Sequence, residues 1–128
     1  MSLKKLIFHK TVVFDFDGVI HSFTSGWHEG QKDTQIFDPP ANGIREIIKK
    51  LRDNGWSVVV VSARCSTLFG RIAIKRWLKK YDIEVDGISR DKVPAHCYID
   101  DRTICFEGDT STLYDSIVKF KSWIDYEE

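Results

Sequence analysis

The sequence predicts an α/β fold in which a parallel sheet carries helices on both faces. Short apolar runs of strand length alternate with segments whose apolar residues recur at helical spacing. This alternation is typical of parallel strands joined by crossover helices. The chain has 128 residues, which suits one domain. We therefore expect a single domain over residues 1–128, arranged in three layers, without room for a separate cap domain.

The first strand is expected at about residues 11–14, where β-branched residues precede two carboxylates. Residues 21–40 follow as a polar stretch with several aromatic residues, and it ends at Pro39 and Pro40. A connection of this length is typical of functional lids or disordered segments. We expect it to form a flap beside the first strand, with Trp27 at the mouth of a pocket.

A helix and a second strand come next. Apolar residues at i, i+3, i+4 and i+7 mark one face of the helix: Ile44, Ile47, Ile48 and Leu51. Asn42 is a candidate cap at its start, and Asn54 with Gly55 ends it. The second strand is expected over residues 56–61, an apolar run that ends at Ser62.

The second half of the chain is expected to hold two helices and three strands. The second helix is marked by apolar Ile74, Trp77, Leu78 and Tyr81, and it has a basic flank over residues 71–80. Strands are expected at residues 87–89, 97–99 and 103–106. Thr112 and Asp115 form a candidate capping pair for a last helix. The apolar face of that helix would consist of Leu113, Ile117, Phe120 and Ile124.

Three of the apolar runs have polar side chains at their carboxyl ends. Asp15 and Asp17 end the first run, and Ser62 ends the second. Asp100 and Asp101 follow the run that closes at residue 99. Ligands of open α/β sheets bind outside the carboxyl ends of the strands, where the strand order reverses. We expect these side chains to meet there.

The first acidic pair indicates a cation site. Asp15 and Asp17 are spaced i, i+2, so in a strand their side chains point the same way. Carboxylates held together repel each other unless a cation separates them, and Mg²⁺ prefers oxygen ligands of this kind. Gly18 permits a sharp turn and the close approach of a ligand. Alone, the pattern also fits a polar turn or a calcium loop, and the second acidic pair favours the metal site.

With these motifs, the sequence resembles the haloacid dehalogenase superfamily, and within it the small, capless, aspartate-based phosphatases of bacteria and phages. The resemblance covers residues 11–108. Four family motifs find a match: Asp15-Phe16-Asp17-Gly18-Val19, Ser62, Lys92 and Asp100-Asp101. It implies a three-layer α/β/α, Rossmann-like fold with strand order 5-4-1-2-3, in which the switch in strand order lies between strands one and four.

The resemblance also implies a role for each motif residue. Asp15 would be the nucleophile that forms an aspartyl-phosphate, and Asp17 would be the general acid and base. Ser62 would donate a hydrogen bond to the transferring phosphoryl group, and Lys92 would neutralise charge beside it. Mg²⁺ would be the cofactor, held by Asp15, Asp17 (through its backbone carbonyl), Asp100 and Asp101.

Further residues are candidates for contact with the substrate, and they are Ala63, Arg64, Arg102 and Trp27. Arg64 and Arg102 each lie next to a motif residue, where they either contact the substrate or pair with the acidic cluster. The basic flank over residues 71–80 is more typical of a solvated helix face, with nucleic-acid contact as the alternative.

The expected function is a Mg²⁺-dependent phosphatase that hydrolyses phosphate monoesters of small molecules. A phosphatase for nucleic-acid ends or for a protein phosphate is an alternative, since a capless site is open to large substrates. A receiver-like phosphoacceptor and a regulatory module with little turnover are further alternatives. A receiver has its acidic pair after the first strand and its phosphoacceptor after the third strand. Here Asp15 and Asp17 come first, and the second acidic pair follows the fourth expected strand, so the motif order argues against a receiver.

Charge, hydropathy and cysteine content limit the binding partners and the cellular compartment that we expect for the protein. Lys and Arg number 19, as do Asp and Glu, so a net charge of zero gives no hint of a nucleic-acid or membrane partner. No apolar run reaches membrane-spanning length, and residues 1–10 lack the pattern of a signal peptide. Three cysteines without metal spacing fit a cytoplasmic protein. We expect Cys97 and Cys105 to be buried, and the oligomeric state stays open.

Overall fold

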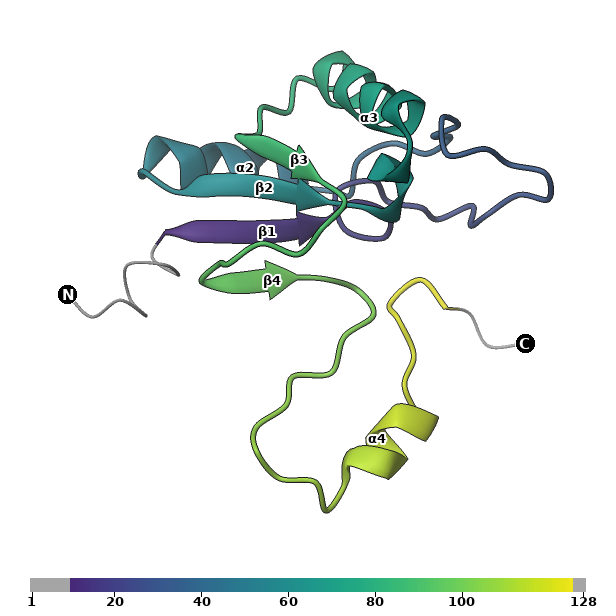
Figure 1. Ribbon diagram of the computed structural model, residues 1–128, viewed down its shortest axis with the longest axis vertical. Helices are drawn as coiled ribbons and strands as arrows, with labels where there is room; N and C mark the ends of the chain where they lie inside the picture. The colour runs from purple at the N-terminus through teal and green to yellow at the C-terminus, as the bar shows by residue number, and fades with distance from the viewer. Residues whose placement is uncertain (1–9, 126–128) are drawn as a thin grey trace.

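The computed structural model describes residues 10–125 of the chain, and Figure 1 shows its arrangement. Strands and helices alternate, as expected for an α/β protein. The elements are β1 (Thr11–Asp15), α2 (Ile44–Asp53), β2 (Ser57–Val61), the 3₁₀ helix η1 (Ala63–Ser66), α3 (Leu68–Lys80), β3 (Gly87–Ser89), β4 (Cys97–Ile99) and α4 (Leu113–Val118). The expectation about a signal peptide falls on residues 1–9, outside the described part. Among the described residues, no helix has the length and apolar character needed to cross a membrane.

The four strands form one parallel sheet in the order β3-β2-β1-β4. Asp15 of β1 is paired with Val61 of β2, and Phe14 with Ile99 of β4. Read from the other edge, this is the expected order of strands one to four, and the switch in order lies between β1 and β4. The residues that follow β1, β2 and β4 therefore share one edge of the sheet.

The expected fifth strand is wrong. Residues 103–106 form no strand, and β4 is the outer strand of the described sheet. The chain turns directly after β4, where the amide of Arg102 donates to the Asp100 carboxylate at 2.9 Å. Cys97 and Cys105 are exposed rather than buried, because the first lies on this outer strand and the second in the unpaired stretch.

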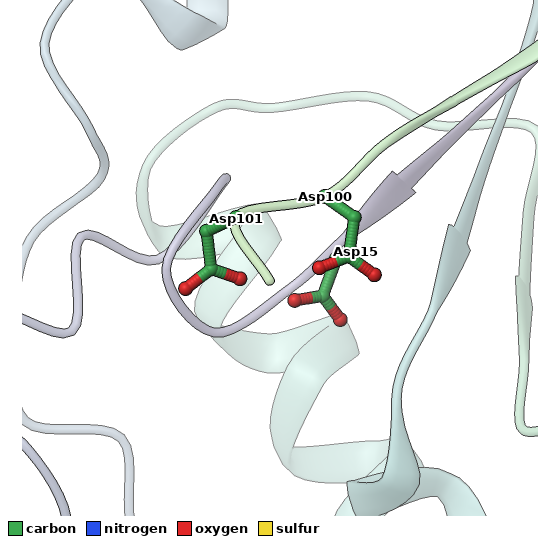
Figure 2. A group of neighbouring side chains, drawn as sticks. All are labelled: Asp15, Asp100 and Asp101. Carbon is green, nitrogen blue, oxygen red and sulfur yellow. The ribbon is translucent and has the colours of Figure 1, made fainter. Parts of the chain in front are cut away.

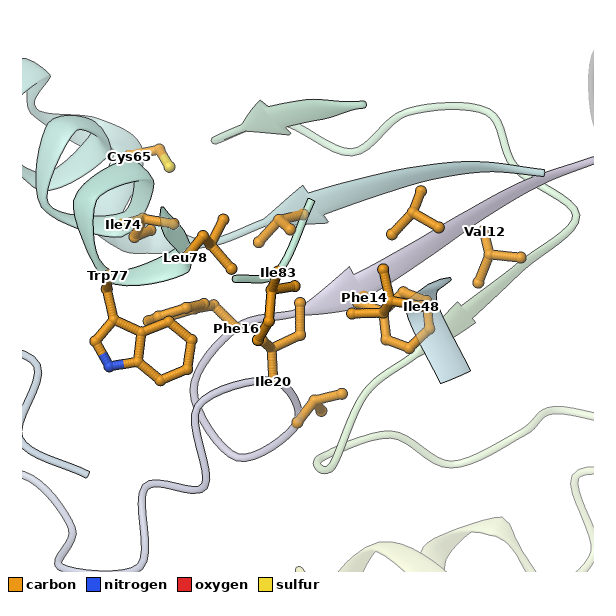
Figure 3. Close-up of a cluster of buried hydrophobic side chains, with 13 residues drawn as sticks. Val12, Phe14, Phe16, Ile20, Ile48, Cys65, Ile74, Trp77, Leu78 and Ile83 are labelled. Carbon is orange, nitrogen blue, oxygen red and sulfur yellow. The ribbon is translucent and has the colours of Figure 1, made fainter. Parts of the chain in front are cut away.

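Helices α2 and α3 cover the same face of the sheet. Successive right-handed crossovers from β1 to β2 and from β2 to β3 run in one direction, which places both helices on one side. Figure 3 shows the buried core between them and the sheet, built from Val12 and Phe14 of β1, Val58 and Val60 of β2, Ile48 of α2, and Ile74, Trp77 and Leu78 of α3. Burial of each such side chain stabilises the folded state by roughly 1.5–3 kcal/mol.

The expected third layer is wrong for the described residues. Helix α4 ends at Val118 instead of continuing to Ile124, and none of its residues is buried. Figure 1 shows it apart from the sheet. A helix of six residues is too short to be stable without packing. The expected caps also fail: Thr112 makes no side-chain cap bond, and Gly43 rather than Asn42 precedes α2.

Residues 21–40, called the flap below, form an ordered excursion beyond the carboxyl ends of the strands (Figure 1). Its two ends are joined, because His21 bridges Pro40 and the amide of Ser22 donates to the Pro39 carbonyl at 2.9 Å. The Trp77 indole of α3 donates to the Asp38 carbonyl at 3.3 Å. The flap is therefore fixed beside the sheet edge that carries the acidic residues.

Candidate active site

Three carboxylates converge at the carboxyl edge of the sheet, and Figure 2 shows them facing one another. Asp15 ends β1, while Asp100 and Asp101 directly follow β4, the parallel neighbour of β1. One oxygen of each carboxylate lies within 4.8 Å of the others. Two oxygens bound to one Mg²⁺ ion lie at most about 4.2 Å apart, so small side-chain movements are enough to bring all three carboxylates onto a single ion. We call these three residues the acidic triad.

Burial and the neighbouring carboxylates raise the pKa of Asp15. The pKa of Asp15 rises to about 8, first because burial removes its carboxylate from water, and further because of the charge of Asp100 and a hydrogen bond with Asp101. A cation among the three oxygens would relieve both effects. The donor set therefore fits a hard divalent ion such as Mg²⁺.

We expect the metal-free protein to lose stability as the pH rises from about 4 to about 8. The folded pKa of Asp15, about 8, exceeds its ordinary value of 3.8, so in this window the folded state holds a proton that the unfolded state has released. The free energy of unfolding then falls with rising pH.

Thermal melts in EDTA across this pH range measure the effect. Mg²⁺ should stabilise the protein more at pH 8 than at pH 5, because protons compete with the metal for the carboxylates. An Asp15→Asn variant is the control, and its melting temperature should depend less on pH. A wild-type melting temperature that does not fall with pH in EDTA contradicts the expectation.

Gly18 lets the chain turn tightly against the acidic triad. Its φ is +87°, and a Cβ at this position would lie 2.2 Å from Oδ2 of Asp101. The positive φ disfavours a side chain here, and a Cβ would require the Asp101 carboxylate to shift. The absence of a side chain at Gly18 thus leaves room for the Asp101 carboxylate.

Gly18→Ala should weaken the affinity for Mn²⁺, used as a probe, by about tenfold or more, the scale for disturbed metal surroundings. The added methyl group would displace the Asp101 carboxylate. Calorimetric titration measures the affinity. Gly26→Ala is the matched control, because Gly26 also has a positive φ, +71°, but has no atom within 4 Å of its Cβ position. Equal affinities in the two variants would show that the displacement is unimportant.

Asp17 lies outside the acidic triad and is held by two buried side chains. Its carboxylate accepts hydrogen bonds from Arg64, through Nε at 2.8 Å and Nη2 at 3.1 Å, and from Nδ1 of His21 at 2.7 Å. Burial raises the pKa of Asp17, but the bonds from His21 and Arg64 outweigh it and lower the pKa. Nε2 of His21 accepts from the Asp38 amide, which assigns the ring proton to Nδ1.

Arg64 joins the flap to Asp17. It is 2% exposed, and its Nη1 donates to the carbonyls of Asp33 and Gln35 at 2.8 and 2.9 Å. The half-exposed Trp27 ring lies over the guanidinium, with 5.1 Å between its centroid and Cζ. Arg64 thus pairs with an acidic residue next to the acidic triad rather than with the triad itself, and its contact with a substrate stays a prediction.

Of the remaining expected residues, Ser62 lies at the sheet edge that carries the acidic triad, whereas Lys92 lies beside Tyr98. Ser62 is buried at the same sheet edge, where its Oγ accepts from the Arg64 amide at 3.1 Å and caps η1; Ala63 beside it is exposed. The Lys92 ammonium instead lies 5.2 Å from the ring centroid of Tyr98. Lys92 is not among the groups that shift the pKa of Asp15.

Residues 119–125, called the strap below, also reach the acidic triad, although the sequence gives no sign of it. Ser122 is buried and donates to Oδ2 of Asp101 at 3.1 Å. The Trp123 indole donates to the Gly18 carbonyl at 2.7 Å. Arg102 pairs with Asp125 at 3.2 Å, so Arg102 anchors the strap. The apolar spacing of this stretch predicts a helix, so the contacts of the strap with the acidic triad do not follow from the sequence pattern.

Comparison with solved structures identifies a protein of similar fold. It is a conserved protein from Bacteroides thetaiotaomicron. The TM-score is 0.54 and the sequences are 22% identical, over 92% of this chain and 98% of that chain. No family model and no curated protein matches the sequence. The likeness supports a Rossmann-like α/β fold with a parallel sheet, and at this identity it shows the fold alone.

Proposed function

We propose that the protein is a Mg²⁺-dependent phosphatase that hydrolyses phosphate monoesters through an aspartyl-phosphate. The observation that carries this proposal is the convergence of Asp15, Asp100 and Asp101 at the carboxyl edge of the sheet. Phosphoryl transfer depends mainly on positioning and on neutralising charge. A carboxylate cluster beside the switch in strand order offers both a nucleophile and a cation site.

In the proposed reaction, a carboxylate oxygen of Asp15 attacks phosphorus, and the bond from phosphorus to the leaving-group oxygen breaks. Water then hydrolyses the aspartyl-phosphate. Mg²⁺, held by the acidic triad and the Asp17 carbonyl, would supply charge neutralisation for the phosphoryl oxygens. Ser62, at the end of the neighbouring strand β2, would hydrogen-bond the phosphoryl group. Lys92 would add positive charge from the loop before β4.

Asp17 is proposed as the general acid and base, which gives a proton to the leaving-group oxygen and then takes one from the attacking water. Its bonds with Arg64 and His21 favour the carboxylate form, which is the form that accepts a proton from the attacking water. Leaving groups that depart without a proton need less help from Asp17. We therefore expect aryl phosphates to react faster than alkyl phosphates.

A panel of phosphate monoesters tests the proposal. The purified protein is assayed with p-nitrophenyl phosphate, sugar phosphates, nucleotides and phosphorylated oligonucleotides, in Mg²⁺ or in EDTA. We expect turnover in Mg²⁺ and none in EDTA. Turnover that persists in EDTA would exclude the metal-dependent mechanism. A phosphorylated protein that accumulates without turnover would instead indicate a receiver-like phosphoacceptor.

A further inference from the structure

The basic residues of α3 have no carboxylate partners within the described part of the chain, unlike most of those on α2. On α2, Arg45, Lys49 and Arg52 form ion pairs, and Lys50 forms none among residues 10–125. Helix α3 carries five cations, Arg71, Lys75, Arg76, Lys79 and Lys80. None of them takes part in an ion pair among residues 10–125. Helix α3 has no acidic residue, so no carboxylate of the helix itself offsets these five positive charges.

A groove of about 380 Å³ lies between α3 and the flap. Ile36 of the flap and Phe69 and Ile72 of α3 give it an apolar lining, and Arg76 and Lys80 lie one helical turn apart along it. The Phe69 side chain is 72% exposed. The groove therefore offers an accessible aromatic ring beside two cations that form no ion pair among the described residues. The Lys80 ammonium also lies 5.2 Å from the ring centroid of Tyr81.

The groove adjoins the residues that hold the candidate active site. Thr34 lines the groove, and the carbonyls on either side of it, those of Asp33 and Gln35, accept hydrogen bonds from Arg64. Arg64 in turn binds Asp17. Phe69 is the second residue of α3, which begins just after η1. The groove is therefore linked through the flap and Arg64 to Asp17, at the sheet edge that carries Asp15.

We propose that this groove binds single-stranded nucleic acid and presents a terminal phosphate of the strand to Asp15. Sequence-independent sites for single strands combine cations along the backbone with aromatic rings on which bases stack. The groove has both elements, and its charge complements a polyanion. The binding step stands by itself, whereas the terminal phosphate as substrate rests on the proposed phosphatase function.

Fluorescence anisotropy with a labelled, unphosphorylated 12-nucleotide oligothymidylate in EDTA tests the binding step. The Arg76→Glu/Lys80→Glu variant should bind about tenfold more weakly or worse. Its salt dependence should fall by about 0.7 log units per decade of salt for each phosphate that the protein no longer neutralises. Phe69→Ala should weaken binding about fivefold or more, the scale of one stacked base.

Lys49→Glu/Lys50→Glu on α2 is the matched control, because it changes the net charge equally on another helix. It should bind like the wild type. Melting temperatures establish that each variant is folded, and single Arg76→Gln and Lys80→Gln substitutions replace the double variant if it fails to fold. Equal weakening in the two double variants, or no binding by the wild type in 50 mM salt, would overturn the proposal.

A 12-residue polyglutamate competitor distinguishes an acidic protein partner. If it competes as well as the oligonucleotide and Phe69→Ala has no effect, the groove binds acidic peptide and the proposal is wrong. The proposed function fails separately from the binding step. Oligonucleotide binding without turnover of any phosphate rejects the phosphatase, whereas turnover of p-nitrophenyl phosphate without oligonucleotide binding rejects the groove.

Discussion

Asp15→Asn is expected to abolish phosphate hydrolysis and to raise the melting temperature of the metal-free protein. The amide is nearly isosteric, but it cannot act as the nucleophile. Loss of a nucleophile typically lowers the rate on the order of 10⁴-fold or more. The same change removes a carboxylate whose charged form is opposed by burial and by Asp100, so the folded state should gain stability.

Assays with p-nitrophenyl phosphate in Mg²⁺ and thermal melts in EDTA measure the two effects at pH 8. Asp53→Asn is the matched control, because Asp53 is an exposed carboxylate at the end of α2. It should leave the rate and the melting temperature almost unchanged. A rate for Asp15→Asn near that of the wild type would reject Asp15 as the nucleophile. A lowered melting temperature would reject repulsion within the acidic triad.

Arg64→Met is expected to cause a large loss of stability, about 3 kcal/mol, which is the scale for breaking a buried ion pair from one side. The variant leaves the Asp17 carboxylate with His21 as its only remaining side-chain partner among the described residues. It also removes the bonds to the flap carbonyls of Asp33 and Gln35. Methionine preserves the apolar part of the side chain and limits the change in packing.

Urea unfolding measures the loss of stability, and Arg45→Met is the matched control. Arg45 pairs with Asp82 on the surface, where an ion pair contributes about 1 kcal/mol or less. The double variant Arg64→Met/Asp17→Asn should recover part of the stability, because it removes the unpaired charge. A loss no larger than that of Arg45→Met would show that Arg64 does not hold the flap.

The elements that build the core are predictable because their signals are local and strong. Val58 and Val60 of β2 and Ile48 of α2 are buried where the pattern indicates. Ile47, on the same predicted face of α2, is instead 52% exposed. The same kind of pattern is misleading at residues 103–106 and in α4. A stretch with the apolar spacing of a strand or helix forms and packs only if a partner surface is present, and that partner lies elsewhere in the chain.

The acidic triad is predictable because parallel neighbouring strands end at one edge. No such rule predicts the bonds around it. Arg64 reaches Asp17 across 47 positions, and Trp123 reaches Gly18 across 105. The position of Arg64 next to Ser62 marks it as a candidate, but no motif marks the buried His21 or the strap residue Ser122. Their roles follow from the path of the chain in space.

The strap is synthesised after Gly18 and Asp101, to which it binds, and this limits when these contacts can form. At about 5–20 residues per second, the ribosome needs about 5–20 s to go from Gly18 to Trp123, its partner 105 positions later. A nascent chain that ends after Asp101 already holds all three carboxylates, yet it lacks the Ser122 hydroxyl that binds one of them. The site is therefore assembled from both ends of the described residues, and the contacts made by the strap form only after Ser122 and Trp123 have been synthesised.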